Sequence, residues 1–147
     1  MKRKSQIVLF VALVVLTLML LPTVVMAQSV QYRDGTYYAE TAPDARGRSG
    51  LIEITVRRGR IFAVHFDEVE RDADGNVIMN KLNNYAYADS WRNARDGDVT
   101  QFSAYPAYIE QLKATGDPAR VDVITGATGS HGSFVAAARA ALRNARR

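Results

Sequence analysis

Two neighbouring stretches of the chain alternate between apolar and polar residues. Every second residue is apolar over 52–56 and again over 62–66, and the Arg58-Gly59 pair separates the two stretches. A period of two is typical of half-buried β-strands, so the pattern predicts an antiparallel hairpin. Phe62 is expected on its inner face and His65 on its outer face.

Shorter strands are expected on either side of this hairpin. Asp34-Gly35 opens a short strand over 36–40, and a brief apolar run predicts another over 121–124. Residues 72–76 read Asp-Ala-Asp-Gly-Asn, a cluster of turn-forming residues. We therefore expect the hairpin to have ended before this cluster.

Three further stretches predict helices. Residues 79–94 suggest a helix, or an irregular helical stretch, around Leu82, Tyr85 and Trp91. A clearer helix is expected over 103–114, where apolar residues recur at i, i+3, i+4 and i+7. A final helix is expected over 130–144. Its core-facing residues are expected to be Phe134, Ala138, Ala141 and Leu142.

This order of elements predicts the fold class. Strands come first, and helices predominate in the second half of the chain. The sequence therefore predicts an α+β protein with one small domain, in which helices pack on an antiparallel sheet. That domain is expected over residues 28–147, a length that suffices for one hydrophobic core.

The first 27 residues have the organisation of an export signal. Lys-Arg-Lys at 2–4 precedes an apolar run over 7–21, and Val25-Met26-Ala27 closes the segment. These are the three parts of a secretory signal peptide. Counted through to Ala27, the run also reaches the ~20 residues that a membrane-spanning helix needs. Residues 1–27 are therefore expected to be a signal peptide or an uncleaved membrane anchor, and the domain to be exported to the periplasm or the cell surface.

The positive charge of the chain lies mostly at its two ends. The formal net charge is +4, and residues 1–27 contribute three cations and no acids. Four more arginines fall within residues 139–147. The remaining body, 28–138, is net negative, which argues against a nucleic-acid surface.

The chain contains no cysteine and two histidines, His65 and His131. This composition excludes a disulfide framework, a thiol nucleophile and a cysteine-ligated cluster. We expect no metal site and assign no catalytic residue. A redox role would need an organic cofactor.

One nonapeptide, residues 122–130, concentrates the candidate chemistry. It reads Asp-Val-Ile-Thr-Gly-Ala-Thr-Gly-Ser and lies just before the final helix. Its glycines permit close approach of a ligand, and the free amides of a helix start favour a phosphate. The plainer alternative is that Ser130 caps the helix.

The nonapeptide resembles the flavinylation motif of the FMN-binding domain family, D-x-x-[ST]-G-A-T-x-[ST]. In that family the last hydroxyl carries FMN through a phosphoester bond, and here that position is Ser130. The residues expected to hold the cofactor are Asp122, Thr125, Gly126, Ala127, Thr128, Gly129 and Ser130. Looser similarity extends over the exported region, including Asp34-Gly35-Thr36-Tyr37 and residues 51–75.

The resemblance implies an exported electron carrier rather than a stand-alone enzyme. Its expected partners are a flavin transferase that attaches FMN and a redox donor in the membrane, with residues 1–27 able to hold the chain there. Two alternatives remain open at this point. The domain binds FMN without a covalent bond, or it is a flavin-free interaction domain of the envelope.

Other residues have both a functional and a structural interpretation. Trp91 and Tyr85 are candidates to stack on a flavin ring, although packing aromatics are commoner. The acidic residues of 67–74 lack the spacing of a calcium loop and are expected to form a solvated turn. Asp122 is expected to orient the loop before Ser130.

Overall fold

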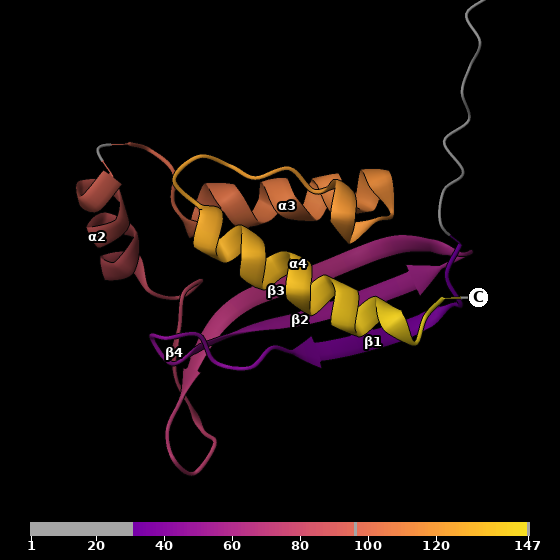
Figure 1. Cartoon of the computed structure of the whole chain (residues 1–147), viewed down its shortest axis with the longest axis horizontal. Coiled ribbons are helices and arrows are strands. Elements are labelled where there is room, and N and C mark those ends of the chain that lie inside the picture. Colours follow the sequence, from indigo (N-terminus) through magenta and orange to yellow (C-terminus); the bar gives the residue numbers. More distant parts are fainter. Residues whose placement is uncertain (1–30, 96, 147) are drawn as a thin grey trace, which may run out of the picture.

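One face of a four-stranded antiparallel sheet is covered by two helices, as Figure 1 shows. The computed structural model describes residues 31–95 and 97–146. The predicted signal or anchor segment, 1–27, lies outside the described residues. The fold is a single small α+β domain, and this prediction is confirmed.

The sheet has the strand order β1-β2-β3-β4, so each strand pairs with its neighbour in sequence. The strands are β1 Gly35–Glu40, β2 Arg48–Arg57, β3 Arg60–Arg71 and β4 Val77–Asn80. The predicted hairpin corresponds to β2 and β3, joined by a turn in which Arg58 (φ 53°) and Gly59 (φ 74°) adopt left-handed backbone angles.

The prediction that Phe62 faces the core is wrong. The β2–β3 register passes from Thr55 opposite Ala63 to Val56 opposite Ile61, which leaves Phe62 as an extra residue on β3. Such a bulge reverses the side-chain alternation beyond it. Ile61 is therefore buried, Phe62 is 54% exposed, and the guanidinium of Arg57 lies over the Phe62 ring. His65 is exposed, as predicted.

The turn over 72–76 does not end the sheet. The Asp72 carboxylate accepts hydrogen bonds from the amides of Asp74 and Asn76, and the chain returns as β4. Asn80 of β4 pairs with Val69 of β3. The predicted helical stretch over 79–94 therefore begins only at Tyr85, with helix α2, Tyr85–Arg95.

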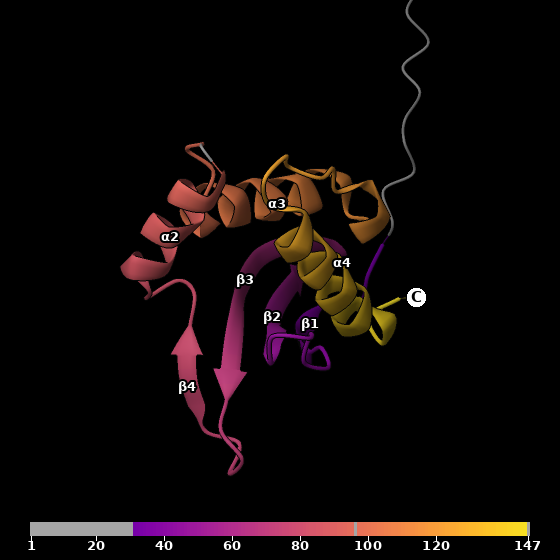
Figure 2. The ribbon, with the colours of Figure 1, turned by 60° about the vertical axis from the view of Figure 1, so that its left-hand side comes forward.

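Helices α3, Gln101–Thr115, and α4, Thr128–Arg143, were both expected and lie against the sheet. Thr100 and Ser103 form a capping box at the start of α3. A short 3₁₀ helix, η1, Pro118–Arg120, follows α3. In Figure 2, α2 lies at one end of the domain, beside the start of α3.

The predicted strand over 121–124 does not form. Its backbone groups bond to side chains of the helices instead of to a strand. The Asp122 amide donates to Gln111 Oε1 at 2.6 Å, and the Val121 carbonyl lies 2.7 Å from His131 Nε2. The segment is therefore a connection held between α3 and α4.

The core lies between the helices and the inner face of the sheet. Phe66 of β3 makes edge-to-face contacts with Tyr105 and Phe134, at ring-centroid distances of 4.9 and 5.0 Å. All four residues predicted to face the core from the last helix are buried, namely Phe134, Ala138, Ala141 and Leu142. Among the described helices, none is long and apolar enough to cross a bilayer.

Candidate functional site

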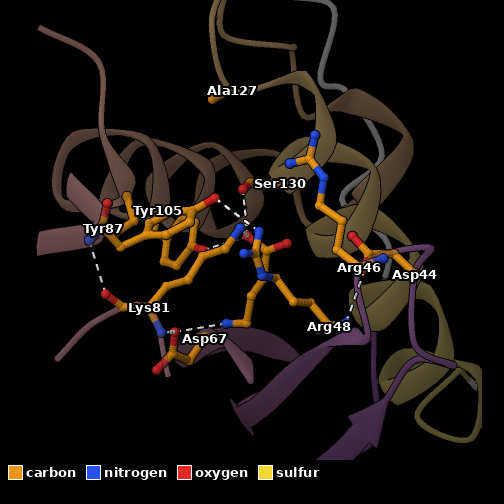
Figure 3. A network of polar contacts seen from close by, with 12 residues as sticks. Asp44, Arg46, Arg48, Asp67, Lys81, Tyr87, Tyr105, Ala127 and Ser130 are labelled. Carbon is orange, nitrogen blue, oxygen red and sulfur yellow. Dashed lines mark hydrogen bonds and ion pairs between the residues drawn. The ribbon is translucent and has the colours of Figure 1, made fainter. Parts of the chain in front are cut away.

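A buried carboxylate, Glu68 of β3, collects three side chains from different elements. Its Oε2 accepts hydrogen bonds from Ser130 Oγ of α4 at 2.5 Å, Tyr105 Oη of α3 at 2.5 Å and Lys81 Nζ at 2.6 Å. Glu68, Lys81 and Ser130 are each 4% exposed. Figure 3 shows the side chains of Ser130, Tyr105 and Lys81 pointing toward one another. We call these four residues the Glu68 cluster.

Helix α4 packs closely against β2 at a glycine, Gly50, and this brings Ser130 near Glu68. Gly50 pairs directly with Glu68 across the β2–β3 ladder. A Cβ atom on Gly50 would lie 2.4 Å from Ser133 Oγ and 3.1 Å from the Ser133 carbonyl oxygen. A side chain at this position would therefore require the Ser133 hydroxyl to turn away and the backbone of α4 to shift slightly from the sheet. The glycine thus permits the contact between Ser130 and Glu68.

Lys81 is held at the cluster by the neighbouring carboxylate of Asp67. Asp67 Oδ1 accepts from the amides of Glu68, Lys81 and Leu82, at 2.7, 3.2 and 3.1 Å. These bonds fix the chain where it leaves β4. Burial raises the pKa of Asp67, and the three amides oppose this shift only in part.

Tyr105 is a firm hydrogen-bond donor in this cluster. Burial raises the pKa of its phenol, and the adjacent Glu68 carboxylate raises it further. The phenol therefore stays protonated at neutral pH, and its O–H donates a hydrogen bond to Glu68. The carboxylate is thus held by two donors in addition to Ser130.

The start of α4 differs from the predicted one. The helix begins at Thr128 with Ala127 as its N-cap, and no side chain caps it. Ser130 is the third residue of the helix, so the alternative that it serves as the N-cap is wrong. The amides of the first turn have no acceptor within the helix and carry its positive dipole end. The loop before them is held by Tyr108 and Trp91, which donate to the carbonyls of Ala127 and Gly126 at 3.1 and 2.9 Å.

A cleft of about 280 Å³ opens at the Glu68 cluster and the start of α4. This volume is just below the range of small-molecule sites, ~300–1,000 Å³. Three of its lining residues are cationic, Arg46, Arg48 and Lys81. Its two acidic lining residues already have partners: Glu68 holds Lys81, and Asp44 accepts backbone amides.

Asp44 organises the loop that carries the two arginines. Its Oδ1 accepts from the amides of Arg46 and Arg48 at 2.8 and 3.0 Å, and the bond from Arg48 is the main reason that the pKa of Asp44 is lowered. Arg48 Nη1 donates to Tyr87 Oη at 3.2 Å, and its guanidinium lies over the Tyr87 ring. Arg48 Nε is buried without a hydrogen-bond partner. One donor of this lining side chain is therefore unused within the described part of the protein.

Two aromatic residues of α2 line the same cleft. Tyr87 and Trp91 are one helical turn apart, with ring centroids 5.8 Å apart, and Lys81 Nζ lies 5.0 and 5.6 Å from the two rings. Trp91 was a predicted candidate for stacking on a ring. Tyr85, the other candidate, is 73% exposed and contacts Phe102 instead.

The structure gathers part of the predicted nonapeptide at the cleft. Four of the seven expected residues line it, namely Gly126, Ala127, Gly129 and Ser130. The other three, Asp122, Thr125 and Thr128, are exposed and lie outside the lining. His131 is half-buried, with its ring against Tyr108 and its Nε2 at the Val121 carbonyl, so it braces the loop.

The sequence pattern did not indicate Glu68 as a site residue, and the prediction that residues 67–74 form a solvated turn is wrong for Asp67 and Glu68. Asp67 and Glu68 are 6% and 4% exposed. Strand parity offered a signal, because Glu68 lies two residues after Phe66 and so shares its inner face. Arg46, Arg48 and Lys81 carried no such signal. Within the described part of the chain, no group of three or more acidic, histidine or cysteine residues could hold a metal ion.

Comparison with known proteins supports the fold. A crystal structure of the CPE2226 protein from Clostridium perfringens superposes with a TM-score of 0.67 and 26% sequence identity, over 78% of this chain and 88% of that one. A scan against protein families and a search of curated proteins give no match.

Proposed function

We propose that this protein carries FMN, joined through a phosphoester bond to Ser130, and acts as an electron carrier at the cell envelope. The observation that carries the proposal is the position of the Ser130 hydroxyl. It belongs to a residue that lines a cleft with three cationic lining residues and the first turn of a helix. Both the motif resemblance and this geometry support the choice of Ser130.

The chemistry of the cleft suits a phosphate ester. A phosphate linked to both Ser130 and a ribityl chain keeps one negative charge. The amides of Gly129 and Ser130 lie in the first turn of α4, where the helix dipole favours an anion. The guanidinium groups of Arg46 and Arg48 supply further donors, and the buried Arg48 Nε has none of its hydrogen-bonding capacity used within the protein. These residues would hold the phosphate.

The aromatic side of the cleft suits a flavin ring. The cleft is small for a whole flavin nucleotide, so the ring would lie toward its mouth, beside Tyr87 and Trp91. When bound, FMN would supply the electron-accepting ring. The role of the protein would be to hold the cofactor and to shield its attachment point.

Co-expression with a flavin transferase tests the attachment. We expect the intact mass to rise by FMN minus water and the protein band to fluoresce after denaturing electrophoresis. Ser130→Ala should abolish both, whereas Ser90→Ala, which removes another hydroxyl that lines the cleft but lies outside the motif, should retain both. Attachment that persists in Ser130→Ala would overturn the proposal.

The same gel separates the alternatives. A yellow protein whose fluorescence is lost on denaturation is a non-covalent FMN-binding module. A colourless protein under every flavin-supplied condition is a flavin-free interaction domain. Cell fractionation, with and without residues 1–27, tests the expected export, and retention of the full chain in the cytoplasm would contradict it.

A further inference from the structure

The hydroxyl of Ser130 does not lie free in the cleft. Its O–H donates a hydrogen bond to Glu68 Oε2, with the two oxygen atoms 2.5 Å apart, in a buried site where both residues are 4% exposed. A serine hydroxyl is a weak nucleophile unless a base takes its proton. The geometry already places such a base at hydrogen-bonding distance.

We infer that Glu68 is the general base that takes the proton of Ser130 when the phosphoester forms, and that Lys81 then passes from Glu68 to the new phosphate. This inference rests on the proposed function. It assigns the proton-accepting step to the protein that is modified rather than to the transferase that modifies it.

The step balances with one named co-reactant. Free FMN would have to expel hydroxide or water, so the donor must be a flavin nucleotide whose phosphate is part of a pyrophosphate. Ser130 Oγ forms a bond to that phosphorus, and the bond from phosphorus to the bridging oxygen breaks. The leaving nucleotide departs as a phosphate monoester with the electron pair. The Ser130 proton passes to Glu68 Oε2, and nothing is oxidised or reduced.

The buried charges stay balanced through this exchange. Before attachment, Lys81 and Glu68 form an ion pair at 2.6 Å, with side-chain exposures of 5% each. When Glu68 takes the proton it becomes neutral, and the phosphodiester brings a new negative charge to the same place. Lys81 can then pair with the phosphate, so no buried charge is left without a partner.

The other groups around Glu68 do not fit the role of base. Tyr105 donates to Glu68 and holds its proton, Lys81 is the cationic partner, and Asp67 is occupied by three backbone amides. Arg46 and Arg48 line the same cleft as cations. The imidazole of His131 is turned to the Val121 carbonyl and the Tyr108 ring.

The test measures the initial rate of flavin attachment to the purified full-length protein, using a transferase and a flavin dinucleotide donor. We expect Glu68→Gln to slow attachment by about 100-fold or more, the usual contribution of a general base. Glu68→Asp, which keeps a carboxylate able to accept the proton, should restore part of the rate that Glu68→Gln loses.

A second variant guards against misfolding. Glu68→Gln alone leaves the Lys81 charge buried and unpaired, whereas Glu68→Gln/Lys81→Met removes both charges together. The double variant should fold, as judged by its cooperative melt, and still take up flavin about 100-fold more slowly than the wild type.

The outcomes separate the two proposals. A wild-type chain that takes up no flavin overturns the proposed function and this inference with it. A wild type that is labelled at Ser130, together with a folded Glu68→Gln or double variant labelled equally fast, overturns the inference alone. A folded Glu68→Asp variant no faster than Glu68→Gln does the same, because a general base must accept the proton, which a carboxylate can do and an amide cannot.

Discussion

Two successive contacts between β3 and α4 have opposite chemistry. Phe66 of β3 packs edge-to-face on Phe134 of α4, and two residues further along the strand Glu68 binds Ser130, one helical turn earlier. Strand residues at i and i+2, and helix residues at i and i+4, share one face. The same pair of elements therefore makes an apolar contact at one step and a charged, hydrogen-bonded contact at the next.

The two contacts contribute different things. Burial of aromatic rings stabilises a fold without further conditions, whereas a buried carboxylate must be compensated by partners. Around Glu68 those partners are Lys81 and Tyr105, and one more bond goes to Ser130, a hydroxyl that lines a cleft. The contact between Phe66 and Phe134 holds α4 on the sheet, and the contact between Glu68 and Ser130 fixes the Ser130 hydroxyl near the start of α4.

The start of each helix repeats this contrast. Helix α3 has a complete capping box from Thr100 and Ser103, and α4 starts at Ala127 with no side-chain cap. At the start of α3, the capping side chains bond to backbone amides. At the start of α4, the first-turn amides have no side-chain partner, and this helix start lines the same cleft as Arg46 and Arg48.

The largest expected effect compares the two contacts directly. Phe134→Ala removes a fully buried ring and should lower the free energy of unfolding by about 3–5 kcal/mol. Ser130→Ala removes one of three hydrogen bonds to Glu68 and should cost about 1 kcal/mol. Urea denaturation of both variants measures the difference. Equal losses would break the comparison.

The next effect concerns the buried ion pair. Lys81→Met leaves the Glu68 carboxylate without its cation and should cost about 3 kcal/mol, at the lower end for such sites because the cleft admits water. Glu68→Gln/Lys81→Met should recover most of this loss. Thermal and urea melts of the three chains decide the matter, and a double variant as unstable as Lys81→Met would show that the pair itself stabilises the fold.

A smaller effect is expected at the glycine beneath α4. Gly50→Ala would force a Cβ atom to within 2.4 Å of Ser133 Oγ. Relieving that clash should cost about 1–3 kcal/mol, and the displaced helix start should slow flavin attachment to Ser130. Gly132→Ala is the matched control, because nothing lies within 4 Å of the added atom. It should be neutral or stabilise the helix by up to ~1 kcal/mol.

The smallest expected effect is the pH dependence of stability that comes from Asp67. Burial raises the folded-state pKa of Asp67 above the unfolded value of about 3.9. Its contribution to stability is therefore fully present below pH ~3.9 and is lost as the pH rises through the folded pKa. Asp67→Asn keeps an oxygen acceptor for the three amides and should remove this decline. The difference between the two melting-temperature profiles across pH isolates it from other carboxylates, and parallel profiles would contradict it.

The fold could be predicted from local patterns where the period of the chain was intact. The helical period placed Phe134 and Leu142 inside, and both are fully buried. The strand period failed at Phe62, because a bulge is a mismatch between two strands and neither strand alone shows it. The strand expected over 121–124 failed for a similar reason, since its backbone partners are side chains of two helices.

By itself, the sequence determined the α+β order, the core face of α4 and the hydroxyl, Ser130, to which the candidate chemistry points. Only the tertiary structure decided what surrounds that hydroxyl. Glu68 is joined to Lys81, Tyr105 and Ser130 across 13, 37 and 62 residues. An acidic side chain is expected to be exposed to solvent unless it has partners that compensate its charge. Local periodicity carries no information about partners so far apart in the sequence. Burial of a charge is a property of the assembled fold.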